Sequence, residues 1–247
     1  MLRTMLLLAL ALPLLLNGCT TTSPTGKTAS YHLQMGAMHL GERNYTSALQ
    51  ELLEAEKLED DNPELLYNLG LAYLGKRRPD LAEPKFLRAI SLKPNYSTAR
   101  NDLGVTYMEL KRWDQAIQQF KLVKDDLLYE QHDSAVINLG LAYLGKGDYD
   151  KALDELNDVR ASNPRSPVVR VAIGRVLAAQ GKTDQSITEF RKALDYYPDY
   201  PMAHYHLGLS LMKSDLVAAR HAFKEVVRLA PDAEISRSAQ EYLELLK

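Results

Sequence analysis

The sequence has very few of the residues that covalent cross-links, metal sites and nucleic-acid binding require. Its 247 residues include a single cysteine, Cys19, which excludes an intramolecular disulfide and a cysteine-based zinc cluster. Thirty Lys and Arg residues stand against 32 Asp and Glu residues, giving a net charge of −2. The chain therefore lacks the excess positive charge that nucleic-acid binding needs. Because it has only one cysteine, its fold must be held by side-chain packing alone.

Sequence motifs for catalysis are also missing. No HExxH, GxSxG or P-loop pattern occurs anywhere in the chain. Among the six histidines, His204 and His206 would point about 200° apart on a helix, so they cannot share a metal ion. His32 and His39 could share a helix face, but no third ligand occurs at a matching spacing. We therefore expect no enzymatic activity, no metal site and no small-molecule substrate.

The one long hydrophobic run lies at the amino terminus. Arg3 precedes a nearly continuous apolar run at residues 5–16, which is interrupted only by Pro13. The run is shorter than the roughly 20 apolar residues of a membrane-spanning helix, but it fits the core of an export signal. The following residues Leu-Asn-Gly-Cys, at 16–19, resemble the lipobox of bacterial lipoproteins. That resemblance implies cleavage before Cys19, which would carry a diacylglycerol and an N-acyl chain and need no other cofactor.

On this interpretation, residues 1–18 are a lipoprotein signal peptide and residues 19–28 are a flexible tether. The tether is rich in Thr and Ser, as flexible linkers are. In lipoproteins of this kind, an Asp directly after the cysteine retains the protein in the inner membrane. Thr20 occupies that position here. The resemblance therefore implies that the protein is anchored at the periplasmic face of the bacterial outer membrane. The alternative is an ordinary secreted protein with a fortuitous cysteine. Because the only cysteine directly follows the apolar run, we favour lipidation.

The rest of the chain is periodic. Glycines preceded by apolar residues recur at intervals of 34, 34, 36, 34 and 34 residues, at Gly36, Gly70, Gly104, Gly140, Gly174 and Gly208. The nine residues NLGLAYLGK at 68–76 recur unchanged at 138–146. This period resembles that of tetratricopeptide repeat proteins, and it implies an all-α, right-handed superhelical solenoid of about six helix pairs.

The pattern also places the repeat boundaries. We expect repeats at 29–62, 63–96, 97–132, 133–166, 167–200 and 201–233, followed by a capping helix at 234–247. Within the second repeat, Gly70 would leave room for the side chain of Phe86 on the second helix. Pro84 lies inside that second helix and is expected to bend it or open it locally.

The resemblance further implies that the fifth and ninth residues of each repeat line a concave groove. These residues are Leu33, Ala37, Tyr67, Leu71, Asn101, Val105, Ile137, Leu141, Val171, Arg175, Tyr205 and Leu209. Most are apolar and only Arg175 is charged, a lining that suits an amphipathic helix or an extended apolar segment of another protein. The alternative is that these side chains merely pack against their neighbours within the stack.

A lipobox, a short tether and about six repeats together resemble the PilW/PilF family, the pilotin lipoproteins of type IV pilus biogenesis. Residues 125–153 (DDLLYEQHDSAVINLGLAYLGKGDYDKAL) contain a lengthened turn that is similar to the corresponding junction in that family. The resemblance implies a scaffold that binds a secretin subunit, is anchored in the membrane by its lipid, and assists localisation and multimerisation of the secretin. The alternative is a general periplasmic adaptor for cell-wall hydrolases or for outer-membrane protein assembly.

Overall fold

The computed structural model describes residues 28–246; the proposed signal peptide, Cys19 and nearly all of the tether lie outside the described residues. Within 28–246 the secondary structure consists of thirteen α-helices without strands. They are α1 (Ala29–Gly41), α2 (Tyr45–Leu58), α3 (Pro63–Gly75), α4 (Pro79–Leu92), α5 (Ser97–Glu109), α6 (Trp113–Lys124), α7 (His132–Lys146), α8 (Tyr149–Ser162), α9 (Pro167–Ala179), α10 (Thr183–Tyr196), α11 (Pro201–Leu211), α12 (Leu216–Leu229) and α13 (Glu234–Leu245).

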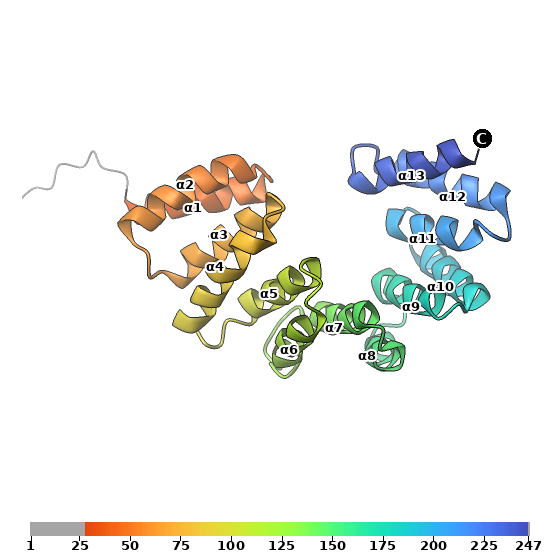
Figure 1. The fold of residues 1–247 in the computed structure, drawn as a ribbon, viewed down its shortest axis with the longest axis horizontal. Coiled ribbons are helices and arrows are strands. Elements are labelled where there is room, and N and C mark those ends of the chain that lie inside the picture. The colour runs from red at the N-terminus through yellow and green to blue at the C-terminus, as the bar shows by residue number, and fades with distance from the viewer. Residues whose placement is uncertain (1–27, 247) are drawn as a thin grey trace, which may run out of the picture.

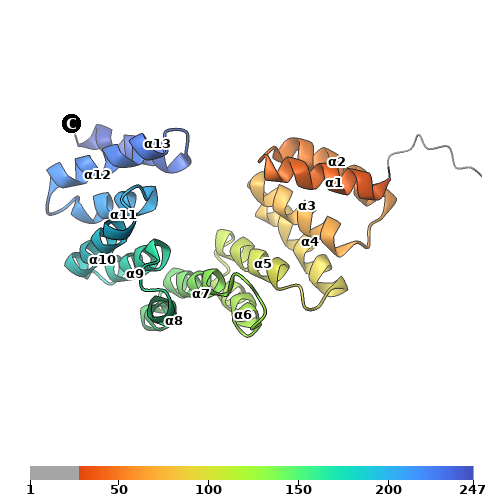
Figure 2. The same cartoon turned by 180° about the vertical axis from the view of Figure 1, so that it is seen from behind.

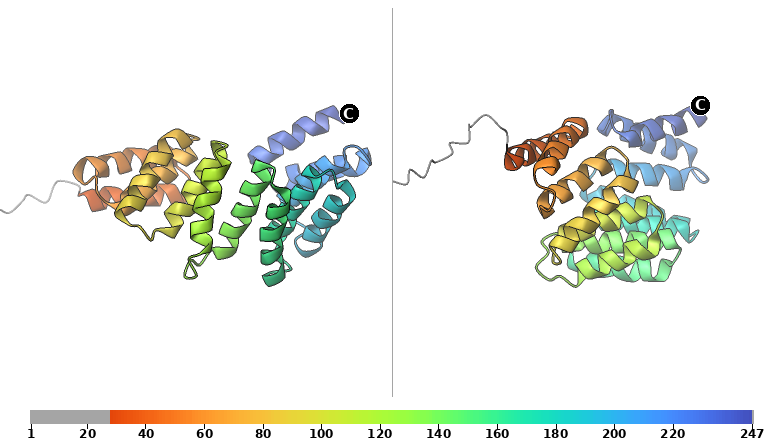
Figure 3. Two further views of the ribbon diagram at one scale, coloured as in Figure 1. Left: turned by 60° about the horizontal axis from the view of Figure 1, so that its bottom comes forward. Right: turned by 60° about the vertical axis from the view of Figure 1, so that its left-hand side comes forward.

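The helices form antiparallel pairs that stack into an arch (Figures 1 and 2). Each odd-numbered helix contacts the next odd-numbered one, whereas the even-numbered helices contact only their odd-numbered neighbours. The odd-numbered helices therefore form the inner, concave layer, and the even-numbered helices spread apart on the longer outer side. The two further views in Figure 3 show the same layers winding as a superhelix. The expectation of an all-α superhelical solenoid is confirmed.

At the start of α3 and of α9, a capping side chain followed by a proline favours the beginning of a helix. The Oδ1 atom of Asn62 accepts hydrogen bonds from the backbone N–H groups of Glu64 and Leu65, at 3.0 and 3.2 Å. Pro63 occupies the first turn, where its missing N–H is not needed. Ser166 and Pro167 start α9 in the same way. Local capping thus fixes where these inner helices begin.

A glycine of the inner helix and a bulky residue of the outer helix hold each pair together. A Cβ atom added to Gly70 would lie 2.4 Å from Cε1 of Phe86, so only glycine leaves room for the buried ring. The same contact recurs in all six repeats, with the bulky residues Leu52, Phe86, Phe120, Leu156, Phe190 and Phe223. The predicted fit of Phe86 against Gly70 is confirmed, and leucine takes the place of phenylalanine in the first and fourth repeats.

Further glycines accommodate contacts between consecutive repeats. The ring of Tyr45, at the start of α2, covers Gly75 in the last turn of α3, where an added Cβ would lie 2.2 Å from a ring carbon. The ring of Trp113, at the start of α6, covers Gly145 of α7 in the same way. These contacts set how closely one helix pair approaches the next.

Pro84 does not open α4 locally, one of the two effects expected from the sequence; the other, a bend, stays a prediction. The helix runs from Pro79 to Leu92 without interruption. Pro84 lies in its second turn, so the missing N–H removes a single intrahelical hydrogen bond. Its side chain is exposed.

The last helix covers the end of the stack. The Tyr242 ring of α13 is stacked on the Phe223 ring of α12, with ring centroids 5.0 Å apart and an interplanar angle of 8°. At its start, Glu234 forms an ion pair with Arg77 in the turn after α3, which joins the two arms of the arch. Both of these side chains are largely exposed, so this ion pair contributes little stability.

The turns between paired helices contain residues in a left-handed backbone conformation. Arg43, Arg77 and Lys111 have φ of 57°, whereas Gly147 and Gly181 occupy the equivalent conformation in later repeats, with φ of 86° and 76°. A left-handed conformation costs a residue with a side chain about 1–2 kcal/mol, but it costs glycine almost nothing.

Replacing Lys111 with glycine is therefore expected to raise the free energy of unfolding by about 0.5–1 kcal/mol. The relief of strain is partly offset because glycine makes the unfolded chain more flexible. Urea unfolding followed by circular dichroism measures the change. Gly147→Ala is the matched control and should lower stability by about 1 kcal/mol; a loss of stability in both variants would contradict the explanation.

Candidate functional site

The predicted groove residues all lie on the inner helices α1, α3, α5, α7, α9 and α11. They differ in how much surface they present. Ile137 and Val171 are only 6% and 4% exposed, so these two side chains pack within the stack and offer a partner very little surface. Ala37 is exposed, and the remaining nine are partly buried. Most of the predicted lining thus contacts the core on one side and solvent on the other.

A polar network crosses the concave face from α3 to α7. The hydroxyl of Tyr67 donates a hydrogen bond of 2.9 Å to Oδ2 of Asp102, and Nδ2 of Asn101 donates one of 3.2 Å to Oδ1 of the same carboxylate. Nδ2 of Asn138 donates to Oδ1 of Asn101 at 3.3 Å. Three successive inner helices are therefore connected by side-chain hydrogen bonds that centre on one carboxylate.

Tyrosine rings lie around this carboxylate. The ring of Tyr67 is 5.2 Å from that of Tyr96. Burial raises the pKa of the Asp102 carboxyl group, although its two hydrogen bonds act in the opposite direction. Tyr129, in the lengthened turn between α6 and α7, is close enough that burial first, and then the charge of Asp102, raise the pKa of its hydroxyl. The turn that is longest in sequence thus contributes an aromatic side chain to the concave face.

A second group of polar side chains lies between α9 and α11. Burial lowers the pKa of the Arg175 guanidinium, and the neighbouring Tyr200 hydroxyl opposes this change. His206 stacks on Phe190 with ring centroids 5.7 Å apart, and its Nε2 atom is buried without a hydrogen-bond partner. Burial, with a smaller contribution from the charge of Arg175, lowers the pKa of His206 to about 4. The imidazole is therefore neutral at pH 7, and Arg175 is the charged member of the group.

The sequence analysis missed Asp102 because it considered only the fifth and ninth residues of each repeat. The sixth residue is polar in five of the six repeats, where it is Gln34, Asn68, Asp102, Asn138 and His206; only in the fifth repeat is it apolar, Ala172. The recurrence of a polar residue at the same position of otherwise apolar inner helices was the signal that could have identified Asp102.

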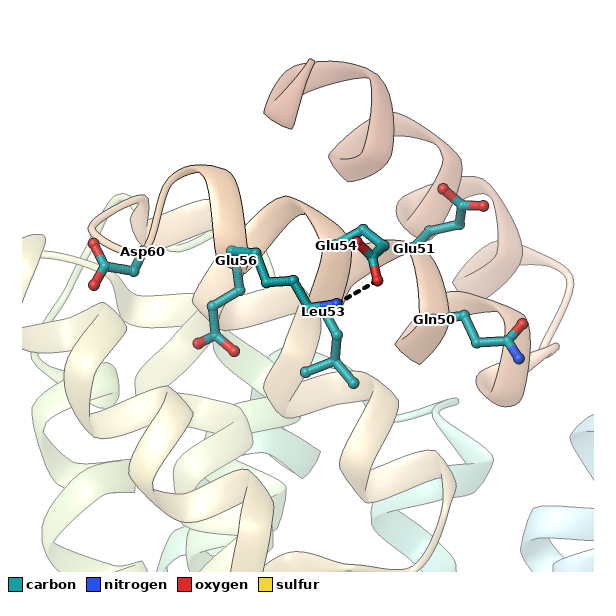
Figure 4. Close-up of a pocket in the computed structure, with 7 residues that line it drawn as sticks. Gln50, Glu51, Leu53, Glu54, Glu56 and Asp60 are labelled. Carbon is teal, nitrogen blue, oxygen red and sulfur yellow. Dashed lines mark hydrogen bonds and ion pairs between the residues drawn. The ribbon is translucent and has the colours of Figure 1, made fainter. Parts of the chain in front are cut away.

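A surface hollow lies against α2, outside the predicted groove (Figure 4). It has a volume of about 680 Å³ and is lined by acidic side chains. Its glutamates are paired, in the ion pairs Glu51–His32, Glu54–Lys57 and Glu56–Lys85.

Residues 28–246 contain no cluster of three side chains that could hold a metal ion. None of the helices in this range combines the length and hydropathy needed to cross a membrane.

Family models match most of the repeated region. A model described as "TPR repeat" matches residues 44–76 and 174–215, and a model described as "Tetratricopeptide repeat" matches residues 69–127 and 101–167. Among curated proteins, the peroxisomal targeting signal receptor of Saccharomyces cerevisiae is 30% identical over 74 residues. That match covers 30% of this chain and 12% of the yeast protein, so it concerns only a short part of that receptor.

Solved structures are similar in fold over nearly the whole described chain. A tetratricopeptide repeat protein from Parabacteroides merdae has a TM-score of 0.79 at 16% identity, covering 88% of this chain and 84% of that one. PilF of Pseudomonas aeruginosa has a TM-score of 0.64 at 18% identity, covering 87% and 97%. PilW, described as a widely conserved type IV pilus biogenesis factor, has a TM-score of 0.69 at 18% identity, covering 86% and 98%. At these identities the likeness establishes the fold, and the repeat matches and the stacked helix pairs together show that this chain is a tetratricopeptide repeat protein.

Proposed function

We propose that the protein is a lipid-anchored scaffold at the periplasmic face of the bacterial outer membrane, where it helps a type IV pilus secretin subunit to localise and multimerise. The concave face carries the proposal, because partly exposed apolar side chains lie there beside polar groups with unused binding capacity. The likeness in fold to PilF and PilW extends over 97% and 98% of those chains and supports the pilus assignment. The residues that resemble a lipobox support the anchor.

The mechanism is one of position. Acyl chains on Cys19 would contribute about 0.8 kcal/mol per buried methylene group, so several long chains would hold the protein stably at the membrane. A secretin subunit bound in the groove would then be concentrated beside the membrane that it must enter. The groove would at the same time shield an apolar segment of the subunit from solvent. This mechanism requires binding and tethering but no chemical reaction.

A general periplasmic adaptor is the second candidate. The fold is shared by many tetratricopeptide repeat proteins, and the Parabacteroides merdae protein has a higher TM-score than either pilus factor. Deleting the gene separates the two candidates. The secretin role requires that secretin multimers disappear from the outer membrane, whereas an adaptor role predicts intact multimers with defects in the cell wall or in porin assembly.

Replacing Cys19 with alanine is expected to release the protein from the membrane without changing its fold, because the only attachment point for acyl chains is removed. Fractionation of the cell envelope measures the release, and circular dichroism checks the fold. Secretin multimers should then accumulate away from the outer membrane. Continued recovery of the Cys19→Ala variant in the outer-membrane fraction would show that the lipobox interpretation is wrong.

A further inference from the structure

Asp102 and Arg175 are partly buried charged side chains of the inner helices that have no partner of opposite charge. Asp102 of α5 accepts hydrogen bonds only from neutral groups, and Arg175 of α9 forms no ion pair with any described residue. The two buried charged side chains of the described residues, Arg170 and Glu189, are paired with each other at 2.8 Å. Burial of an unpaired charge is costly, so two such charges on a concave face indicate partners that come from outside the chain.

The surroundings of Asp102 suit a cationic side chain. The hydrogen bonds from Tyr67 and Asn101 favour its ionised form, whereas burial raises the pKa of the carboxyl group, so a cation beside Asp102 would stabilise the carboxylate further. The nearby tyrosine rings offer faces that attract cations, and the ring of Tyr96 already has Nζ of Lys93 4.3 Å from its centroid. Tyr129 is brought to this position by the lengthened turn, which gives the two extra residues of the third repeat a role.

The surroundings of Arg175 suit a carboxylate. A guanidinium has five N–H groups in a planar fork that matches a carboxylate, and none of them donates a hydrogen bond to a described acceptor. Its nitrogen atoms retain contact with solvent, unlike the sealed Nε2 atom of His206. Because His206 is neutral at pH 7, the site offers a single positive charge. One charge matches a carboxylate better than a phosphate dianion, which would leave an unpaired negative charge.

The two charges are separated along the groove by α7, which lies between α5 and α9 in the inner layer (Figure 1). Val105 of α5 and Leu141 of α7, two of the predicted groove residues, are half-buried apolar side chains on these inner helices. We propose that the concave face binds an apolar protein segment with a cationic side chain that meets Asp102 and a carboxylate that meets Arg175. The two charges then fix the direction in which the segment lies. This inference rests on the proposed role of the groove in protein binding.

A library of random twelve-residue peptides displayed on phage tests the inference on the full-length protein in detergent micelles. The selected peptides should combine Lys or Arg with Asp or Glu, in one fixed order, around apolar residues. Asp102→Asn should abolish the enrichment of cations but keep that of acids, and Arg175→Gln should have the reverse effect. Each variant should bind the selected peptides at least tenfold more weakly. Asp60→Asn and Lys57→Gln, on the outer side of the arch, are the matched controls and should select the same peptides as the unaltered protein.

The outcomes separate this inference from the proposed function. Selection of apolar peptides without ordered charges would overturn the inference and leave the groove as a protein-binding surface. The absence of any enriched peptide would overturn both. Where a variant does not fold, as judged by circular dichroism, selected peptides with the acid replaced by its amide are measured on the unaltered protein. An unchanged affinity of those peptides would overturn the assignment of Arg175.

Discussion

Replacing Gly70 with valine is expected to lower the free energy of unfolding by about 3 kcal/mol, although valine normally favours a helix more than glycine does. The reason is steric, because a Cβ at this position would lie 2.4 Å from the ring of Phe86, which is fully buried. The ring cannot move away without disrupting the contact between α3 and α4. Urea unfolding followed by far-UV circular dichroism measures the loss.

The explanation can be tested by removing the ring. Phe86→Ala alone is expected to cost about 3–5 kcal/mol, since it leaves a cavity in the core. In that background Gly70→Val should cost nothing or stabilise the protein, so the two sites should show a coupling energy of about 3 kcal/mol. Gly41→Val is the matched control, because nothing lies within 4 Å of a Cβ at Gly41. Equal losses for Gly41→Val and Gly70→Val would contradict the steric explanation.

Acidification from pH 7 to pH 4 is expected to remove about 3 kcal/mol of stability through His206 alone. Its pKa is about 4 in the folded protein, below the ordinary value of 6.5, chiefly because the ring is buried. The unfolded chain therefore binds a proton more readily than the folded chain does. The stabilising contribution is complete above pH 6.5 and is lost as the pH falls from 6.5 towards 4.

Two substitutions isolate this contribution. His206→Phe retains a ring to stack on Phe190 but cannot titrate, so the difference in stability between this variant and the unaltered protein should depend on pH between 4 and 6.5. Arg175→Gln removes the positive charge that helps to lower the pKa of His206, so the loss should still begin near pH 6.5 but should be smaller and end at a higher pH. Urea unfolding at a series of pH values measures both effects. Parallel pH profiles for His206→Phe and the unaltered protein would refute the role of His206.

The repeat architecture could be predicted from the sequence because this architecture depends on contacts between residues that are close in the chain. The glycine of one helix and the bulky residue of the next are only about half a repeat apart, as Gly70 and Phe86 show. Their spacing can therefore be read directly from the periodicity. The helix starts are equally local, since Asn62 and Pro63 act within a single turn. The local opening expected at Pro84 does not occur, because losing one hydrogen bond in an exposed second turn does not outweigh the rest of α4.

The chemistry of the groove was decided by the tertiary structure. Tyr67 and Asp102 are 35 residues apart, and they meet only because consecutive helix pairs stack at a particular angle. The same stacking buries Ile137 and leaves Arg175 without a partner of opposite charge. A repeat period determines which residues belong to the inner helices, but the rotation from one repeat to the next determines how much of each side chain remains exposed. That rotation results from packing between repeats, which the periodicity of the sequence does not specify.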